Sequence, residues 1–254
     1  MHFKQETHTV NGVKVAMLTA GSGEPLVFWH GAGTFTGFDF ALPWASRFRV
    51  IIPYHPGWGD SGDAPELATP GDYMLHYLDL FDQLGLAQVN LVGLSMGGRF
   101  AATFAIEHGE RLRKLVLIAP AGLALPEHPG TDFSKVPPEE TPRYLVEDFA
   151  AISKYLPKGP DPKFQAARER EGGNFFRMLD AGLVGPWLPR WLHRVKAPTL
   201  LVWGEKDRIV PIGHTDAWKK LIPHAQLLRV PGVGHLPMQE DPGVPAAIAD
   251  FLDG

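Results

Sequence analysis

The chain has 254 residues, of which 44 % are hydrophobic and 20 % are charged, a composition typical of a globular protein with a packed core. Its formal net charge is −4 and no run of lysine or arginine stands out, so we expect neither a nucleic-acid partner nor a membrane-binding patch. The absence of cysteine excludes disulfide bonds, thiolate metal sites and a cysteine nucleophile.

The N-terminal part of the chain begins with polar residues and continues with strand patterns. Residues 1–10 lack the apolar segment of a secretory signal, which favours a cytoplasmic location. No apolar run reaches the ~20 residues that a membrane span needs. Asn11-Gly12 lies between two alternating stretches and predicts a tight hairpin turn. Continuous apolar runs at residues 25–29 and 48–53 are typical of parallel strands that are buried on both faces.

The next segments alternate between helix and strand patterns. Apolar residues recur at helical spacing over residues 71–86, and Gly85 is the expected stop of that helix. A strand at 89–92, a helix at 96–108 and a strand at 115–119 follow. This alternation predicts a doubly wound, mostly parallel sheet of the α/β class.

A proline-rich segment, residues 121–194, interrupts this alternation. Thr141-Pro142 and Asp161-Pro162 each combine a helix-capping residue with proline at the first helical position. We therefore expect short helices here and interpret the segment as a helical lid inserted into one α/β core.

Strand patterns return at residues 199–203 and 226–230, and a terminal helix is expected to start near Pro242. The sequence shows no internal repeat and no low-complexity tract. The expected organisation is thus a single α/β core formed by residues 1–120 and 195–254, with the insertion as its lid.

The most informative motif is Gly93-Leu94-Ser95-Met96-Gly97, between an apolar strand pattern and an alanine-rich helix pattern. A serine on so sharp a turn projects its hydroxyl from the edge of the sheet, and the flanking glycines remove Cβ atoms that would clash. The N-terminus of the following helix favours developing negative charge at the site. We therefore predict Ser95 as a catalytic nucleophile, in preference to a serine that only forms a packing turn.

Position along the chain selects the groups that would activate Ser95. His235 follows the last strand pattern and lies at the same edge of the sheet as the nucleophile, where open α/β sheets place their sites. Asp207 follows the strand at 199–203, where its carboxylate can accept the second imidazole N–H and fix the tautomer. Glu205 is the rival carboxylate for this role.

Other acidic residues and histidines fit these roles less well. Asp39, Asp60 and Asp63 precede Ser95 and so fall in the wrong part of the chain for a nucleophile–acid–histidine order. We interpret His30 as structural, bracing its loop by hydrogen bonds.

A tetrahedral intermediate needs two hydrogen-bond donors aimed at its oxygen. We expect one donor to be the backbone N–H of Met96, the residue after the nucleophile. The other should come from the loop after the strand at 25–29, where Ala32 is the first choice and Gly33 the next.

Four segments, in this order along the chain, together resemble the α/β-hydrolase superfamily: His30-Gly31-Ala32-Gly33, Pro56-Gly57-Trp58-Gly59-Asp60-Ser61, Gly93-Leu94-Ser95-Met96-Gly97-Gly98, and Gly204 to Pro211 with Gly234-His235. The resemblance covers the expected core and implies the α/β-hydrolase fold. With serine as nucleophile it implies an esterase, a C–C bond hydrolase, a lactonase or a cofactor-free perhydrolase. Haloalkane dehalogenases and epoxide hydrolases of this superfamily use aspartate at this position, so those activities are disfavoured.

Two features make the sequence less similar to the C–C bond hydrolases of that superfamily. These enzymes usually have a longer loop with glycine and proline after the His-Gly pair, and a tryptophan after the catalytic histidine. Here the loop reads Ala32-Gly33-Thr34, and Leu236 follows His235.

Aromatic residues gather in the lid and indicate an apolar acyl or aryl pocket. They are Phe149, Tyr155, Phe164, Phe175, Phe176, Trp187 and Trp191. Phe176 and Trp187, together with Gly33, are the candidate substrate-binding residues. Three arginines of the lid are interpreted as a solvated helix face, in preference to a site for a substrate carboxylate: Arg168, Arg170 and Arg177.

We expect a carboxylic-ester hydrolase that works through an acyl-enzyme on Ser95 and takes small to medium apolar or aryl substrates. A C–C bond hydrolase of ring-cleavage dienoates is one alternative, and a ligand receptor of the same fold with little turnover is another. No metal or other cofactor is implied, because the histidines show no ligand spacing and no glycine-rich loop ends in Lys-Ser/Thr. The expected partner is a small-molecule ester, and the sequence predicts no oligomeric state.

Overall fold

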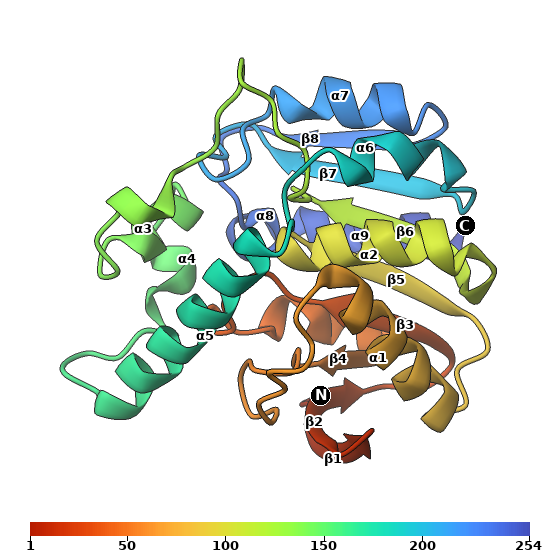
Figure 1. The fold of residues 1–254 in the computed structure, drawn as a ribbon, viewed down its shortest axis with the longest axis horizontal. Coiled ribbons are helices and arrows are strands. Elements are labelled where there is room, and N and C mark those ends of the chain that lie inside the picture. The colour runs from red at the N-terminus through yellow and green to blue at the C-terminus, as the bar shows by residue number, and fades with distance from the viewer.

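The computed structural model of the chain describes residues 1–254 and is built around one eight-stranded sheet (Figure 1). Its strands are β1 (Lys4–Val10), β2 (Val13–Ala20), β3 (Glu24–Trp29), β4 (Phe48–Pro53), β5 (Val89–Leu94), β6 (Leu112–Ile118), β7 (Thr199–Gly204) and β8 (Gln226–Val230). They lie in the order β1-β2-β4-β3-β5-β6-β7-β8. β2 is antiparallel to both β1 and β4, and the remaining neighbours are parallel. The predicted mostly parallel α/β sheet is therefore confirmed.

The turn between β1 and β2 lies where the sequence predicts it. Asn11 and Gly12 have φ angles of 49° and 83°. A tight hairpin turn with two positive φ angles matches the twist of the strands, and asparagine and glycine adopt such angles most easily. The predicted hairpin is confirmed.

Helices cover both faces of the sheet (Figure 1). They are η1 (Asp39–Ser46), α1 (Pro70–Gln83), α2 (Met96–Glu107), η2 (Gly109–Arg111), α7 (His214–Leu221), α8 (Pro237–Glu240) and α9 (Gly243–Asp253), in addition to those of the insertion. α1, α2 and α7 contribute to one apolar core, whereas η1 and α9 contribute to another. All helices are too short or too polar to cross a lipid bilayer.

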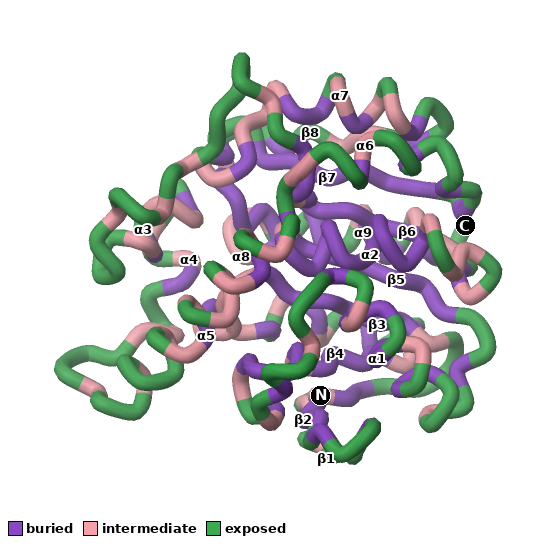
Figure 2. Tube along the Cα trace, viewed as in Figure 1, coloured by how far each residue is buried: buried purple, intermediate pink, exposed green.

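Successive side chains of the central strands divide between these two cores. In β3, Val27 and Trp29 belong to the core beneath α1 and α2, whereas Leu26 and Phe28 belong to the core beneath η1 and α9. This division follows from the alternation of side chains along a strand. Every residue of β5 and β7 is buried, as the purple strands at the centre of Figure 2 show.

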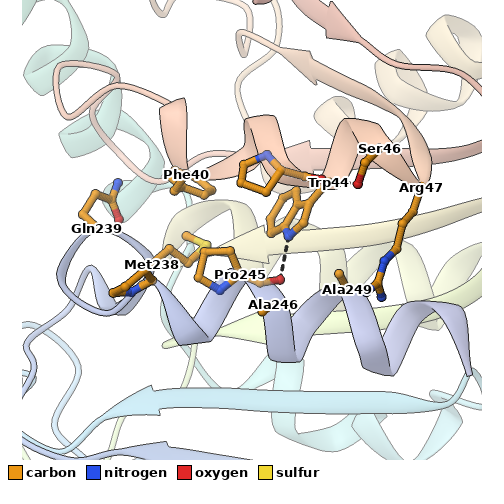
Figure 3. A pocket seen from close by; sticks show the side chains of 11 residues that line it. Phe40, Trp44, Ser46, Arg47, Met238, Gln239, Pro245, Ala246 and Ala249 are labelled. Atoms are coloured by element: carbon orange, nitrogen blue, oxygen red, sulfur yellow. Dashed lines mark hydrogen bonds between the residues drawn. The ribbon is translucent and has the colours of Figure 1, made fainter. Parts of the chain in front are cut away.

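A contact between η1 and α9 closes the second core. Figure 3 shows the indole of Trp44 donating a hydrogen bond to the carbonyl oxygen of Pro245, with 2.8 Å between the two atoms. At the end of η1, Arg47 pairs with Asp250 of α9 at 2.7 Å. The pocket between these two elements contains none of the site residues predicted from the sequence.

The predicted insertion lies between β6 and β7. Its elements are η3 (Phe133–Lys135), α3 (Thr141–Leu145), α4 (Ala150–Ser153), α5 (Pro162–Asp180), α6 (Trp187–Trp191) and η4 (Leu192–Arg194). Figure 1 shows α3, α4 and α5 beyond the edge of the sheet at which β5 ends, whereas α6 lies over the sheet. Leu188 and Leu192 belong to the same core as α2, so the last two elements of the insertion pack on the sheet face.

The capping predictions for the insertion have different outcomes. Asp161 caps α5, since its carboxylate accepts the backbone N–H of both Lys163 and Phe164 at 3.0 Å. Thr141 does not cap α3: it is already the first helical residue, and the helix has no side-chain cap. α7 was not predictable from the sequence, because its 8 residues are fewer than the window of about 11 in which a helical period can be recognised.

Candidate active site

The sheet has a topological switch point between β3 and β5. From β3 the chain continues to β4 on one side, and β5 then pairs with β3 on the other side. In open α/β sheets, ligands bind in the crevice at the carboxyl ends of such strands. Ser95 follows β5 directly and His30 follows β3 directly, so the switch point places both loops at one crevice.

Ser95 occupies a sharp turn between β5 and α2, with a φ angle of 53° and a ψ angle of −114°. Such a conformation costs on the order of 1–3 kcal/mol for a residue with a side chain. Backbone hydrogen bonds maintain it, because the Ser95 N–H donates to Ile118 O and the Ser95 carbonyl accepts from the N–H groups of Arg99 and Ala121. The strained strand-to-helix turn that the motif predicts is therefore present, and Ser95 lines a cavity.

Glycines on both sides of Ser95 allow the turn to approach its neighbours closely. A Cβ at Gly93 would lie 2.8 Å from the side chain of Ala101 in α2. A Cβ at Gly97 would collide with the carbonyl oxygen of Trp29 at the end of β3. The spacing of the motif thus reflects the contact of α2 with two adjacent strands.

His235 and Asp207 form a buried pair, with 2.8 Å between the imidazole Nδ1 and the carboxylate Oδ2. The other carboxylate oxygen accepts the backbone N–H of Ile209 at 2.8 Å and that of Val210 at 2.9 Å. Because the Asp207 carboxylate accepts at both oxygens, the proton of a neutral His235 lies on Nδ1. The Nε2 atom then carries the free lone pair that a general base needs.

Of the carboxylates considered from the sequence, Asp207 is the one that contacts His235. The rival Glu205 is exposed and accepts no hydrogen bond, so the structure does not bring it to the imidazole. The three acids excluded by chain order are also exposed and bond elsewhere: Asp39, Asp60 and Asp63. No hydrogen bond joins Ser95 Oγ to His235 Nε2, a contact that often tightens only when substrate binds.

The loop after β3 approaches the nucleophile closely, since a Cβ at Gly31 would lie 3.4 Å from the Cβ of Ser95. The backbone N–H groups of Ala32 and Gly33 donate to no acceptor within the protein. Met96 is the first residue of α2, so its N–H has no acceptor within the helix. The predicted oxyanion donors are thus free N–H groups.

Two side chains fix the peptide groups that carry these loop donors. His30 Nδ1 donates to Gly31 O at 2.7 Å, and the Trp58 indole donates to Ala32 O at 2.8 Å. In a trans peptide the N–H points away from the carbonyl. The two bonds therefore orient the N–H groups of Ala32 and Gly33, respectively.

His30 has the structural role expected from the sequence. Its Nε2 accepts the backbone N–H of His55 at 3.1 Å, while its Nδ1 donates to the loop. The His55 side chain donates back to His30 O at 2.8 Å and accepts from the hydroxyl of Tyr77. Burial lowers the pKa of His30 to about 4, so its imidazole is neutral at pH 7.

A cavity of about 440 Å³ extends from Ser95 beneath the insertion. Most of its lining is apolar and includes Leu123, Leu125, Phe133, Phe175, Phe176, Leu179, Leu183 and Val184. The structure thus places Phe176 in the pocket that the sequence predicts, whereas Trp187 and Gly33 do not line it. Trp187 is 40 % exposed, and the Arg99 guanidinium lies 5.3 Å from the centre of its ring.

Two histidines that no sequence motif singles out, His128 and His214, also line this cavity. His214 is buried, and its Nε2 donates to His128 O at 2.9 Å. Burial lowers the pKa of His214, so its imidazole is neutral at pH 7. No lysine or arginine lines the cavity, and no group of three or more His, Asp or Glu residues is placed to hold a metal ion. Neither residue is part of a motif, since His128 lies in a loop and His214 begins the short helix α7, so the sequence carries no signal for them.

Two arginines of α5 contact the core, so the interpretation of this face as solvated is wrong for them. Arg170 donates to Gly59 O at 2.9 Å and pairs with Asp63 at 2.7 Å. The Arg168 guanidinium lies 3.8 Å from the centre of the Phe35 ring. Their partners belong to loops much earlier in the chain, which the local helical pattern does not reveal.

Residues 26–248 match the model described as the alpha/beta hydrolase family. A 2-hydroxy-6-oxo-6-phenylhexa-2,4-dienoate hydrolase of Comamonas testosteroni is 31 % identical over 222 residues, which cover 77 % of this chain and 75 % of the relative. A poly(3-hydroxyalkanoate) depolymerase of Ectopseudomonas oleovorans is 32 % identical over 232 residues, which cover 84 % and 78 %. Among solved structures, a bacterial membrane phospholipase A is similar with a TM-score of 0.84 and 25 % identity over 99 % of this chain and 86 % of that one.

Proposed function

The chain belongs to the alpha/beta hydrolase family, and we propose that it is a serine hydrolase that cleaves carboxylic esters of small to medium apolar or aryl substrates. The observation that carries this proposal is the buried His235–Asp207 pair at the sheet edge where Ser95 occupies its strained turn. Nucleophile, base and orienter in this arrangement support acyl transfer.

The proposed reaction proceeds through an acyl-enzyme. Ser95 Oγ attacks the ester carbonyl carbon while His235 Nε2 takes the hydroxyl proton, and Asp207 holds the resulting imidazolium. The N–H groups of Ala32 and Met96 donate to the oxyanion of the tetrahedral intermediate. His235 returns the proton to the leaving alcohol as the C–O bond breaks. A water then attacks the acyl-enzyme with His235 as base, and the acid is released with Ser95 restored.

The insertion has the position of a lid in this proposal. Residues 121–134 and the C-terminal half of α5 supply most of the cavity lining outside the core. We assign the lid function to the part of residues 121–194 that lies beyond the sheet edge, which contains α3, α4 and α5.

The charge of the cavity favours an ester over a dienoate. A 2-hydroxy-6-oxo-dienoate carries a carboxylate, and burying a carboxylate without a partner is costly. The cavity next to Ser95 offers no lysine or arginine, and its buried imidazole, His214, is neutral at pH 7. An uncharged acyl or aryl group fits this lining better.

The C–C bond hydrolase remains the second candidate, because a dienoate hydrolase is 31 % identical to this chain. Initial rates on p-nitrophenyl esters from acetate to decanoate, beside rates on a 6-phenyl dienoate, separate the two. We expect Ser95-dependent ester hydrolysis that is faster than dienoate cleavage, with Ser95→Ala inactive and Ser153→Ala, an exposed control, unchanged. Efficient dienoate cleavage with slow ester hydrolysis would replace the main proposal by the second.

A further inference from the structure

Three side chains of helix α5 form hydrogen bonds with two loops of the core. Arg170 donates to the carbonyl of Gly59, and Asn174 donates to the carbonyl of Gly57 at 2.8 Å. Glu171 lies between them and accepts hydrogen bonds from both loops. The helical spacing of these residues directs all three to one side of α5.

Glu171 is the most buried of the three, with 3 % of the residue exposed. Its Oε1 accepts from the Thr34 hydroxyl at 2.5 Å and from the Gly59 N–H at 3.1 Å. Its Oε2 accepts from the Thr34 N–H at 3.1 Å. Three donors surround the carboxylate, which is the arrangement that a buried carboxylate requires.

The bonds of Glu171 join the loop after β3, which contains Ala32, to the loop that contains Trp58 and Gly59. Thr34 follows the candidate oxyanion donors by one or two residues, so the Glu171 bonds fix the C-terminal side of that loop. Gly59 follows Trp58, whose indole donates to Ala32 O. Glu171 therefore bridges the oxyanion loop and the loop that orients it.

We propose that Glu171 is a positioning residue that holds the Ala32–Thr34 loop in the geometry that binds the oxyanion. The catalytic competence of the core then depends on the docking of α5. This inference rests on the proposed function, because it assigns a role in ester hydrolysis at the same site.

Glu171→Gln tests this role with little change of volume. The glutamine amide replaces one acceptor oxygen by an NH2 group. That donor then faces an N–H or O–H donor of Thr34 or Gly59 and cannot bond with it. We expect kcat for a p-nitrophenyl ester to fall roughly 10- to 100-fold, at or below the effect of removing one oxyanion donor, with KM changed by less than about threefold. Glu169→Gln is the matched control, because Glu169 is exposed on the same helix.

A transition-state analogue separates positioning from general stability. An alkyl trifluoromethyl ketone forms a tetrahedral adduct with serine and places an oxyanion at the loop, whereas the corresponding alkyl carboxylate does not. We expect Glu171→Gln to weaken the ketone in proportion to its loss of kcat and to leave the affinity for the carboxylate unchanged. Thr34→Ala, which removes the hydroxyl donor alone, should show the same pattern with a smaller change.

Two outcomes would overturn the inference. Unchanged kcat and ketone affinity in Glu171→Gln would show that the loop does not depend on this carboxylate. Equal loss of ketone and carboxylate affinity would indicate general damage to the site. If Glu171→Gln does not fold, the same measurements on Thr34→Ala decide whether the inference holds. An inactive wild type would instead refute the proposed function, so the two failures are distinguishable.

Discussion

The Nδ1 atom of His235 lies 2.8 Å from Oδ2 of Asp207, and neither residue is more than 5 % exposed. Because the second carboxylate oxygen is held by two backbone N–H groups, Asp207 cannot rotate away without leaving those donors unpaired. This fixed pair determines which imidazole nitrogen is available to Ser95.

Asp207→Asn should lower kcat for ester hydrolysis by about 10⁴-fold, because the amide stabilises the wrong imidazole tautomer. Glu205→Gln is the matched control and should leave kcat within about twofold, since Glu205 is exposed and contacts no imidazole. Steady-state kinetics of both variants measure the effect. A large loss in Glu205→Gln with little loss in Asp207→Asn would assign the role of orienter to the other carboxylate.

Gly97→Ala should destabilise the protein by at least about 2 kcal/mol, because the added Cβ meets the carbonyl oxygens of Trp29 and His30. Gly173→Ala, in α5, is the control: a Cβ there meets nothing within 4 Å, so better helix propensity should stabilise the protein by about 0.5–1 kcal/mol. Urea unfolding measures both free energies. Equal stability of the two variants would contradict the close packing of α2 on β3.

Phe176→Ala should raise KM for long-chain p-nitrophenyl esters by about fivefold, because Phe176 lines the cavity and loses apolar contact with the acyl chain. Trp187→Ala should leave KM unchanged, since Trp187 lies outside the cavity against Arg99. Rates across the ester panel provide the measurement. The opposite pattern would place the acyl chain along α6 and not within the cavity beneath α5.

The stability of the protein should fall as the pH falls from 6.5 toward 4. Burial lowers the pKa of His30 from 6.5 to about 4, so in this window the unfolded chain binds the proton and the folded chain does not. The contribution of His30 is therefore fully present above pH 6.5, and about 3 kcal/mol of it is lost by pH 4. Burial lowers the pKa of His55 as well, which adds to the effect with the same sign.

Urea unfolding at pH 7 and pH 5 measures this dependence. His30→Gln should reduce the difference between the two free energies of unfolding, and His193→Gln, at an exposed position, should not. A wild-type free energy of unfolding that is the same at both pH values would contradict the neutral, buried state of His30.

The fold and the nucleophilic turn were predictable from the sequence because their signals are local. The strands are short apolar runs, and the glycines around Ser95 record a close approach that no larger residue allows. The choice of Asp207 over Glu205 also agrees with the contact to His235, although the two carboxylates lie only two positions apart.

The remaining features depend on contacts between distant segments. Arg170 and Glu171 have the appearance of a charged helix face in sequence, yet their partners lie in loops more than a hundred positions earlier. The sequence does not show which aromatic residues of the insertion face the cavity. Phe176, which lines it, therefore could not be distinguished from Trp187, which does not. His214 belongs to a helix too short for its pattern to be recognised.

Covalent labelling tests directly whether Ser95 is the activated nucleophile. The wild type, Ser95→Ala and His235→Asn are each treated with an alkyl fluorophosphonate, and the intact mass and the modified peptide are determined. We expect one phosphonyl group per wild-type chain, located on Ser95, with no labelling of Ser95→Ala and much slower labelling of His235→Asn. Labelling of a different serine, or a wild type that stays unmodified, would contradict it.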